Sequence, residues 1–331
     1  MIPQTNPQPI LQLLGSHMAA KYLFTANQIG LFAALADGPL DLDGLQAATS
    51  IPRRTLRIVA DALGATGFLE RRDGTYHNSA VAAAFLSGGP GPDLRPIIQM
   101  WDQVVYRQWD TLEAAVRSGH ATYGYGDFTP EEQQIFAVGV ETLTAPAAQA
   151  LAATYDWSPH RGLLDLGGGT GSFTLAILRQ APALDAILYE LPATAAVIRQ
   201  RHTQPQGATV FQIVEGNFLA DPLPTGCDVV LLANVIHLFS PQVNQGLLRR
   251  VRGAVTAGAR LLLVDFWTDA THTQPAFAAL MAGEFLIVGG EGDVYSVDEA
   301  ATWLRGSGWQ LLEHKPLAGA ASLIVAEAVD Q

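Results

Sequence analysis

The sequence predicts an α/β fold in two parts, a mainly helical N-terminal domain of the winged-helix type followed by a doubly wound, largely parallel sheet. Two observations predict this arrangement. From residue 161 onward, short apolar runs alternate with helix-like segments, which is typical of parallel strands joined by crossover helices. Before that point, apolar residues recur at helical spacing and lead into a hairpin pattern. A chain of 331 residues is long enough for about two domains of ordinary size.

The N-terminal elements follow the order expected of a winged helix-turn-helix. Residues 10–35 carry apolar positions at helical spacing and form a helix or a helix pair. Asp41 can cap a short helix that runs to Ala48, and Pro52 can open the next helix. Residues 68–77 then form two short strands around an Asp-Gly turn.

The second part of the chain supplies the strands of the sheet. We expect strands at residues 163–166, 186–189, 210–214, 228–235 and 261–266, and a terminal antiparallel pair at 309–314 and 322–327. The resulting domains are 1–92 for the winged helix, 93–155 for a mostly helical connecting segment, and 156–331 for the sheet domain.

Composition narrows the classes of partner. The chain is 49% hydrophobic and carries a formal net charge of −12, which disfavours nucleic acid and anionic membrane surfaces as partners. Residues 1–155 hold nine basic against fourteen acidic residues, whereas DNA-binding winged helices usually have a basic surface. No apolar run approaches the ~20 residues of a membrane span. Cys227 is the only cysteine, so we expect a soluble cytoplasmic protein without disulfides.

A glycine-rich loop follows the first predicted strand of the sheet. Residues 165–171 read Asp-Leu-Gly-Gly-Gly-Thr-Gly and open a helix. The missing Cβ atoms leave room for a nucleotide-like ligand on the turn. Glu190, which ends the second strand, can accept hydrogen bonds from both hydroxyls of a ribose.

The spacing of this loop favours S-adenosylmethionine over a dinucleotide. Ser172 stands where the Gly-x-Gly-x-x-Gly fingerprint requires its third glycine. A carboxylate at Asp165 would repel a diphosphate and attract a sulfonium and an amino group. A dehydrogenase remains an alternative, as does a plain structural turn.

The chain resembles the small-molecule O-methyltransferases of the caffeate and hydroxyindole type over nearly its whole length. The winged helix, the aromatic helical segment and His237 carry this resemblance, together with the motifs Leu-Leu-Asp-Leu-Gly-Gly-Gly-Thr-Gly, Tyr-Glu-Leu-Pro, Glu-Gly-Asn-Phe and Asn-Val-Ile-His. It implies a doubly wound Rossmann-like methyltransferase sheet, S-adenosylmethionine as cofactor and a small acceptor from secondary metabolism. It also implies that the N-terminal domain builds a homodimer, and that the connecting segment lines the substrate pocket.

The resemblance also implies roles for individual residues. His237 falls on the family's general base, and Asp265 falls on an acid that orients it. The residues that fall on cofactor contacts are Asp165, Gly167, Gly169, Glu190, Asn217, Phe218 and Ala233. The apolar candidates for the substrate wall are Trp101, Trp109, Phe136, Met281 and Phe285.

Several positions depart from the family pattern. Glu190 and Asn217 stand where the family usually has Asp, and Leu238 replaces the Asp that commonly follows the histidine. Gly292 lies near the place of a second supporting acid, with Glu291 or Asp293 as the alternative alignment. These changes affect the acid-base step more than cofactor binding.

Methyl transfer from a sulfonium needs a positioned nucleophile and a base rather than a metal. A methyltransferase acting on carbon is an alternative, in which His237 binds an acidic substrate and His272 with Asp265 completes a metal site. A chain that uses the cofactor for decarboxylation or cyclisation is another. Glu284 is a lone charge in the apolar run 278–288, and it either faces the pocket or lies on a solvated helix face.

Overall fold

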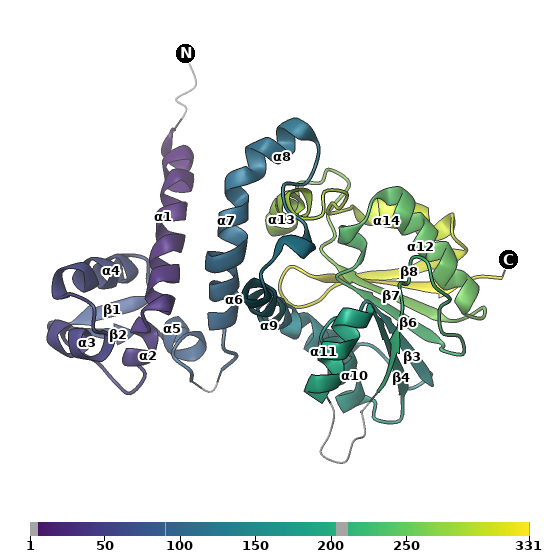
Figure 1. Cartoon of the computed structure of the whole chain (residues 1–331), viewed down its shortest axis with the longest axis horizontal. Helices are drawn as coiled ribbons and strands as arrows, with labels where there is room; N and C mark the ends of the chain where they lie inside the picture. Colours follow the sequence, from purple (N-terminus) through teal and green to yellow (C-terminus); the bar gives the residue numbers. More distant parts are fainter. Residues whose placement is uncertain (1–5, 90, 203–210, 331) are drawn as a thin grey trace. The chain divides into compact units, whose positions relative to one another are not determined.

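The computed structural model describes residues 6–89, 91–202 and 211–330 (Figure 1). Its contacts divide the chain into two compact units that interleave in sequence. The first unit holds Met1–Arg107 and Thr129–Leu143, and the second holds Gln108–Phe128 and Thr144–Gln331. The connecting segment predicted from the sequence therefore contributes to both units.

The first unit contains the predicted winged helix. Asp41 caps its helix by accepting a hydrogen bond from the Gly44 backbone N–H at 2.8 Å. The hairpin turns at Asp73 and Gly74, both with positive φ, as a tight two-residue turn requires. The elements are α1 (Gln8–Gln28), α2 (Leu31–Ala34), α3 (Leu42–Thr49), α4 (Arg53–Ala65), β1 (Leu69–Arg72), β2 (Thr75–Asn78), α5 (Ala80–Phe85), α6 (Arg95–Met100) and the π-helical turn η1 (Trp101–Val105).

Helix α1 presents apolar side chains to solvent along its first half. Gly30, with φ of 70°, ends the helical run and starts α2, so the predicted helix pair is confirmed. The C-terminal part of α1 packs into the core of this unit through Phe24 and Ala26. The exposed apolar residues are Ile10, Leu11, Leu13, Leu14 and Met18, each more than half exposed.

The second unit is built on a seven-stranded sheet of order β5-β4-β3-β6-β7-β9-β8. Strands β3 to β7 run parallel, and β9 and β8 add an antiparallel edge. The predicted strands are confirmed; Val210, in one predicted run, lies outside the described residues. The strands are β3 (Gly162–Leu166), β4 (Asp185–Glu190), β5 (Gln212–Glu215), β6 (Val229–Ala233), β7 (Arg260–Asp265), β8 (Trp309–Pro316) and β9 (Ser322–Ala328).

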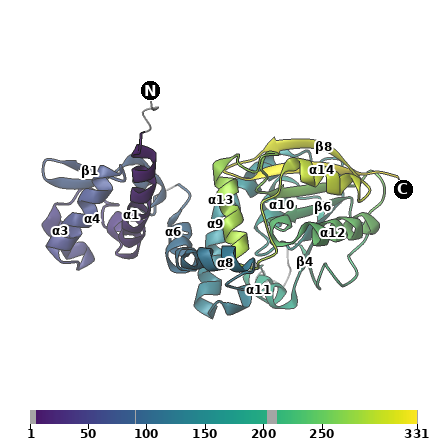
Figure 2. The ribbon, with the colours of Figure 1, turned by 90° about the horizontal axis from the view of Figure 1, so that it is seen from above.

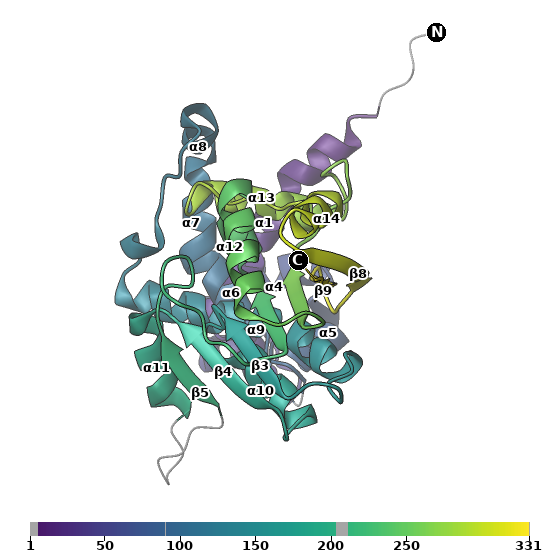
Figure 3. The same ribbon diagram turned by 90° about the vertical axis from the view of Figure 1, so that its right-hand side faces the viewer.

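Helices cover both faces of this sheet, as alternating strand and helix patterns predict. One face packs against α10, α11 and the end of α9, and the other against α12 and α14. The sheet and its helices can be followed from the front in Figure 1, from above in Figure 2 and from the side in Figure 3. The remaining helices of the chain, of which α7 and α9 are divided between the two units, are α7 (Tyr106–Gln108), η2 (Trp109–Thr111), α8 (Leu112–Ser118), η3 (Tyr125–Asp127), α9 (Pro130–Thr154), α10 (Ser172–Gln180), α11 (Pro192–His202), η4 (Ile236–Leu238), α12 (Pro241–Ala254), α13 (Ala276–Ile287) and α14 (Val297–Arg305).

Helix α9 is long and apolar enough to cross a membrane by length and composition alone. The buried helix of a soluble protein passes the same test. The C-terminal part of α9 does lie in the core of the second unit, where Ala147, Ala148 and Leu151 are buried. Within the apolar window of α9, 28% is buried, so this packing accounts for part of its apolar composition.

Candidate active site

The carboxyl ends of the parallel strands gather the predicted site residues at one edge of the sheet. Paired neighbours β4 and β5 end in register at Glu190 and Glu215, and β6 pairs with β7 up to Ala233 and Val264. Ligands of open α/β sheets bind beyond these ends. The glycine loop, Glu190, Asn217, Ala233 and Asp265 all lie at that edge.

The glycine loop adopts a backbone that side chains would obstruct. Gly167, with φ of 73°, would place a Cβ 3.1 Å from Val235 and 3.3 Å from the Phe218 ring. Gly169 also has positive φ, and its Cβ position faces open space. Gly171 forms the N-cap of α10 in the left-handed conformation. The loop thus turns from strand to helix in a few residues and keeps its outer side free of side chains.

Glu190 ties this loop to the end of β4. The Gly169 backbone N–H donates to its Oε1 at 3.2 Å, and the Leu191 backbone N–H donates to its Oε2 at 2.6 Å. Burial raises the pKa of the Glu190 carboxyl, while the two backbone donors lower it. Because each oxygen keeps a second lone pair, Glu190 can also accept from a ligand on the loop.

Asp165 lies beneath the loop and has no exposed surface. Its Oδ2 accepts from the Thr174 hydroxyl at 2.6 Å, and its Oδ1 has no partner among the described residues. Burial raises the pKa of this carboxyl to about 7. The sequence predicts a direct attraction between Asp165 and a cationic ligand, but a residue without exposed surface supports the loop from the inside instead.

The turn after β5 holds Asn217 and Phe218. The Asn217 side chain accepts from the Leu219 backbone N–H at 2.9 Å, so it shapes this turn. The Phe218 ring lies beside Gly167 and makes an edge contact with Phe239, with centroids 6.0 Å apart. Phe218 therefore forms a wall next to the glycine loop.

His237 and Asp265 form a buried pair, with 7% and 2% of their surfaces exposed. His237 Nδ1 lies 2.6 Å from Asp265 Oδ1, and the His237 backbone N–H donates to Oδ2 at 3.3 Å. The Phe266 backbone N–H donates to Oδ1 at 2.8 Å, which fixes the carboxylate further. This geometry suits a neutral ring that donates from Nδ1 to the carboxylate and keeps Nε2 as an acceptor.

Residues 291–293, where the sequence predicts a second supporting acid, contact the backbone of His237 and not its ring. The Asp293 backbone N–H donates to the His237 carbonyl at 3.1 Å. A Cβ on Gly292 would lie 2.1 Å from the same carbonyl oxygen, so this position tolerates no side chain. Glu291 and Asp293 are exposed, and in the described part of the chain the carboxylate bonded to the His237 ring is that of Asp265.

Comparison with known proteins decides the family. Residues 109–310 match the model of the O-methyltransferase domain, and residues 11–88 match that of the O-methyltransferase dimerisation domain. The chain is 32% identical to a 3-hydroxy-5-methyl-1-naphthoate 3-O-methyltransferase of Streptomyces sahachiroi, over 86% of this chain and 84% of the relative. The chain belongs to the O-methyltransferase family.

Two solved structures support the fold of this methyltransferase. PigF with SAH superposes with a TM-score of 0.85 at 28% identity, covering 98% of this chain and 100% of that one. Human N-acetylserotonin methyltransferase in complex with SAM gives a TM-score of 0.87 at 21% identity and covers 100% of both chains. The protein is an enzyme, and its cofactor is S-adenosylmethionine.

The glycine loop of the methyltransferase fits this cofactor. A Cβ on Gly167 would enter the space in front of Val235 and Phe218, and Gly169 leaves its own position open. The partly exposed Glu190 carboxylate is bonded to the same loop. A side-chain-free turn beside an acceptor suits a nucleoside with an attached chain.

The aromatic residues predicted for the substrate wall divide between the two units. The Phe285 ring stacks on His237, with centroids 3.9 Å apart and planes at 14°. Met281 packs against the same small cluster as Phe285 and Phe266. Trp109 also belongs to the second unit, whereas Trp101 and Phe136 belong to the first, and their role in the wall stays a prediction.

The sequence left open whether Glu284 faces the pocket or lies on a solvated helix face. It is 8% exposed, so the hypothesis of a solvated helix face is wrong. Its Oε2 accepts a hydrogen bond from Trp109 Nε1 at 2.6 Å. The signal available in the sequence was a single charge in an otherwise apolar helix.

The alternative metal site is not assembled in the described part of the chain, which holds no group of three or more His, Cys, Asp or Glu residues able to bind a metal ion. His272 lies 3.3 Å from Glu299 instead.

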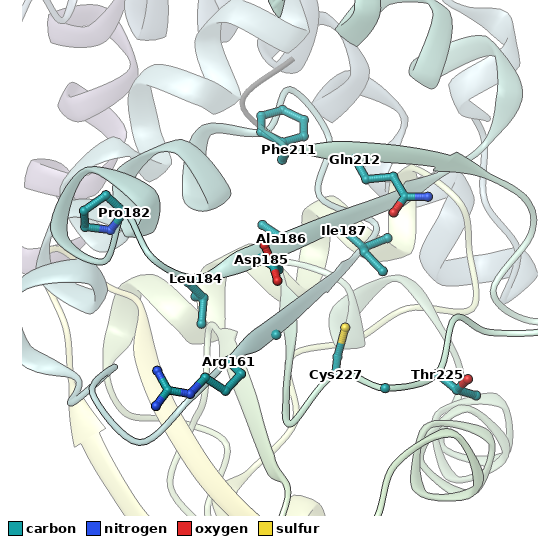
Figure 4. A pocket seen from close by; sticks show the side chains of 12 residues that line it. Arg161, Pro182, Leu184, Asp185, Ala186, Ile187, Phe211, Gln212, Thr225 and Cys227 are labelled. Atoms are coloured by element: carbon teal, nitrogen blue, oxygen red, sulfur yellow. The ribbon is translucent and has the colours of Figure 1, made fainter. Parts of the chain in front are cut away.

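A separate pocket of about 760 Å³ opens at the opposite edge of the sheet (Figure 4). Its lining includes residues at or just before the amino ends of the strands, namely Arg161, Asp185, Gln212 and Cys227. Burial raises the pKa of the Cys227 thiol to about 11, so this thiol is not activated as a nucleophile. The pocket is not lined by His237, Asp265 or the glycine loop.

Proposed function

We propose that His237 is the general base that removes the proton of an acceptor hydroxyl, and that Asp265 orients it. The single observation that carries this proposal is the 2.6 Å contact between His237 Nδ1 and Asp265 Oδ1. It leaves Nε2 as a proton acceptor and allows the carboxylate to stabilise the imidazolium that forms.

When bound, S-adenosylmethionine supplies a methyl group on a positively charged sulfur, and S-adenosylhomocysteine is the leaving group when the acceptor oxygen takes that methyl group. The proton of that oxygen goes to His237 Nε2, so charge does not build up on the acceptor. The Phe285 ring, stacked on His237, limits the rotation of the imidazole and excludes water from one of its faces.

The cofactor contacts are proposed from the loop geometry. Gly167 and Gly169 provide the surface for the ligand, Glu190 binds the ribose hydroxyls, and Phe218 packs beside the adenine together with Asn217. Ala233, at the end of β6, offers its backbone. Asp165 acts indirectly by holding the loop from below.

The acceptor is a small, largely apolar molecule with a phenolic or enolic hydroxyl, made in secondary metabolism. The relatives' names support this class: a naphthoate, a tetracenomycin polyketide and acetylserotonin are their acceptors. A relative 28% identical over 94% of this chain is named N,N-dimethyltransferase OxyT, from Streptomyces rimosus. The atom that receives the methyl group therefore has to be identified in the product.

Replacement of the pair tests the base directly. We expect His237→Ala to lower kcat by at least about 100-fold, since a general base contributes roughly 10²–10⁴. Asp265→Asn also lowers kcat, because it no longer fixes the tautomer. S-adenosylhomocysteine affinity, measured by calorimetry, should change less than about threefold in both. Near-normal turnover of His237→Ala would contradict the assignment.

We also propose a homodimer assembled through the N-terminal unit, in a cytoplasmic enzyme. The dimerisation-domain match at residues 11–88 and the exposed apolar half of α1 support the dimer. The buried Cys227 and the core packing of α9 support a soluble protein in a reducing compartment.

A further inference from the structure

Glu284 is a nearly buried carboxylate with one unused oxygen. Trp109 Nε1 donates to Oε2 at 2.6 Å, and within the described ranges no other hydrogen bond or ion pair reaches this side chain. The free Oε1 is not among the fully buried polar atoms that lack a partner in the described residues, so it keeps some accessible surface. Burial of the residue raises the pKa of this carboxyl, and the Trp109 bond lowers it only in part.

The surroundings hold Glu284 in a fixed position. The six-membered ring of Trp109 packs over Gly283, where a Cβ would lie 3.0 Å from the indole. The backbone N–H groups of Thr122 and Tyr123 both donate to the Ile287 carbonyl at 3.1 Å, which ties the loop at residues 119–128 to the end of α13. This cage consists of parts of one unit.

Glu284 lies on α13, the helix that also contacts the proposed catalytic base. Phe285, the next residue of α13, stacks on His237 at 3.9 Å. Burial, together with the charge of Glu284, raises the pKa of the Tyr125 hydroxyl to about 12. No Lys or Arg among the described residues is paired with Glu284, so the charge is open to a donor from a ligand.

We propose that Glu284 is a specificity residue, whose free Oε1 accepts a hydrogen bond from a second O–H or N–H group of the acceptor. The preferred acceptors then carry one hydroxyl for methylation and one further hydrogen-bond donor. This inference rests on the proposed function, because it assumes that the acceptor binds beside His237. A charge-assisted bond of this kind discriminates by about 10- to 100-fold in Kd.

Glu284→Gln replaces the free hydrogen-bond acceptor, Oε1, with a hydrogen-bond donor. The Trp109 N–H requires an acceptor, so the amide oxygen turns toward it and the NH₂ group takes the place of Oε1. A donor then faces the second hydroxyl of the acceptor. Glu291→Gln, an exposed position in the same unit, is the matched control. Trp109→Phe is a second variant that removes the internal donor and leaves the carboxylate in place.

The test measures binding to the chain loaded with S-adenosylhomocysteine, so it does not depend on turnover. The probes are 1,3-, 1,6- and 2,7-dihydroxynaphthalene, each compared by calorimetry with its monomethyl ethers. We expect at least one diol to bind at least tenfold more tightly than its ether in the unmodified chain, in Glu291→Gln and in Trp109→Phe. In Glu284→Gln the ratio should fall to about threefold or less.

Equal affinity of diol and ether for the unmodified chain, or binding of neither, would overturn the inference. A ratio that survives in Glu284→Gln would do the same, since Glu284 would then serve only to satisfy Trp109. Failure of the proposed function looks different: S-adenosylhomocysteine would give no heat, or labelled methyl would not reach any acceptor.

Discussion

Asp165 is a motif residue whose burial changes its protonation and its access to a ligand. Its carboxyl has no exposed surface and receives one hydrogen bond, from Thr174. Removal from water raises its pKa to about 7, well above the ordinary value of 3.8. Near neutral pH the residue therefore exchanges between a neutral and a charged state beneath the glycine loop.

This pKa predicts a pH dependence of stability. Between about pH 4 and 7 the folded chain keeps a proton on Asp165 that the unfolded chain releases, so rising pH costs stability in this window and no further above it. The expected slope is at most about 1.4 kcal/mol per pH unit. Urea unfolding at pH 5, 6 and 7 should show this loss in the unmodified chain relative to Asp165→Asn. Parallel stability curves would contradict the burial argument.

The places of site residues were predictable from the sequence where a motif fixes both the residue type and its position. Asp265 ends β7, and His237 lies in η4 shortly after the neighbouring strand β6 ends at Ala233, so strand order brings them to the same edge of the sheet. The depth of Asp165 and the burial of Glu284 were not predictable, because both depend on packing that local periodicity does not reveal. Asp165 is bonded by Thr174 on the helix that follows the loop, and Glu284 by Trp109, which is 175 residues away.

The glycine loop is the element that joins fold and site. A parallel strand, a tight turn and a crossover helix need positive φ at Gly167, Gly169 and Gly171, and the same absence of side chains creates the surface proposed for the ligand. Gly168 adds a second constraint, since a Cβ there would lie 2.7 Å from Asp165 Oδ2. The sequence predicted this element well because glycine and strand signals are local.

Helix α1 carries an apolar surface that the folded first unit does not bury. Leu13 and Leu14 are 74% and 62% exposed, although burial of one leucine contributes about 1.5–3 kcal/mol. We expect Leu13→Glu with Leu14→Glu to weaken the homodimer by at least about 100-fold in Kd, measured by analytical ultracentrifugation.

Val116→Glu, at a 63% exposed position in α8, serves as the control for a surface charge and should leave the dimer intact. A double variant that still sediments as a dimer at the same concentration would show that α1 is not part of the interface.

At the scale of the whole molecule, the sequence predicted the order of domains but not how the chain is shared between them. The segment 93–155 reads as one helical connection, yet residues 108–128 pack with the sheet unit and residues 129–143 with the first unit. The cause is a set of contacts between distant segments, such as Tyr123 with Ile287 and Lys21 with Asp102. Local periodicity carries no information about such pairings.

The transfer of a labelled methyl group tests the central claim most directly. The chain is incubated with S-adenosylmethionine carrying ¹³C in its methyl group and with the dihydroxynaphthalenes, and the products are analysed by mass spectrometry and NMR. We expect one labelled methyl group attached to oxygen, and its loss with His237→Ala. Label on carbon or nitrogen, an isomerised or decarboxylated product without label, or no labelled product despite S-adenosylhomocysteine binding would contradict it.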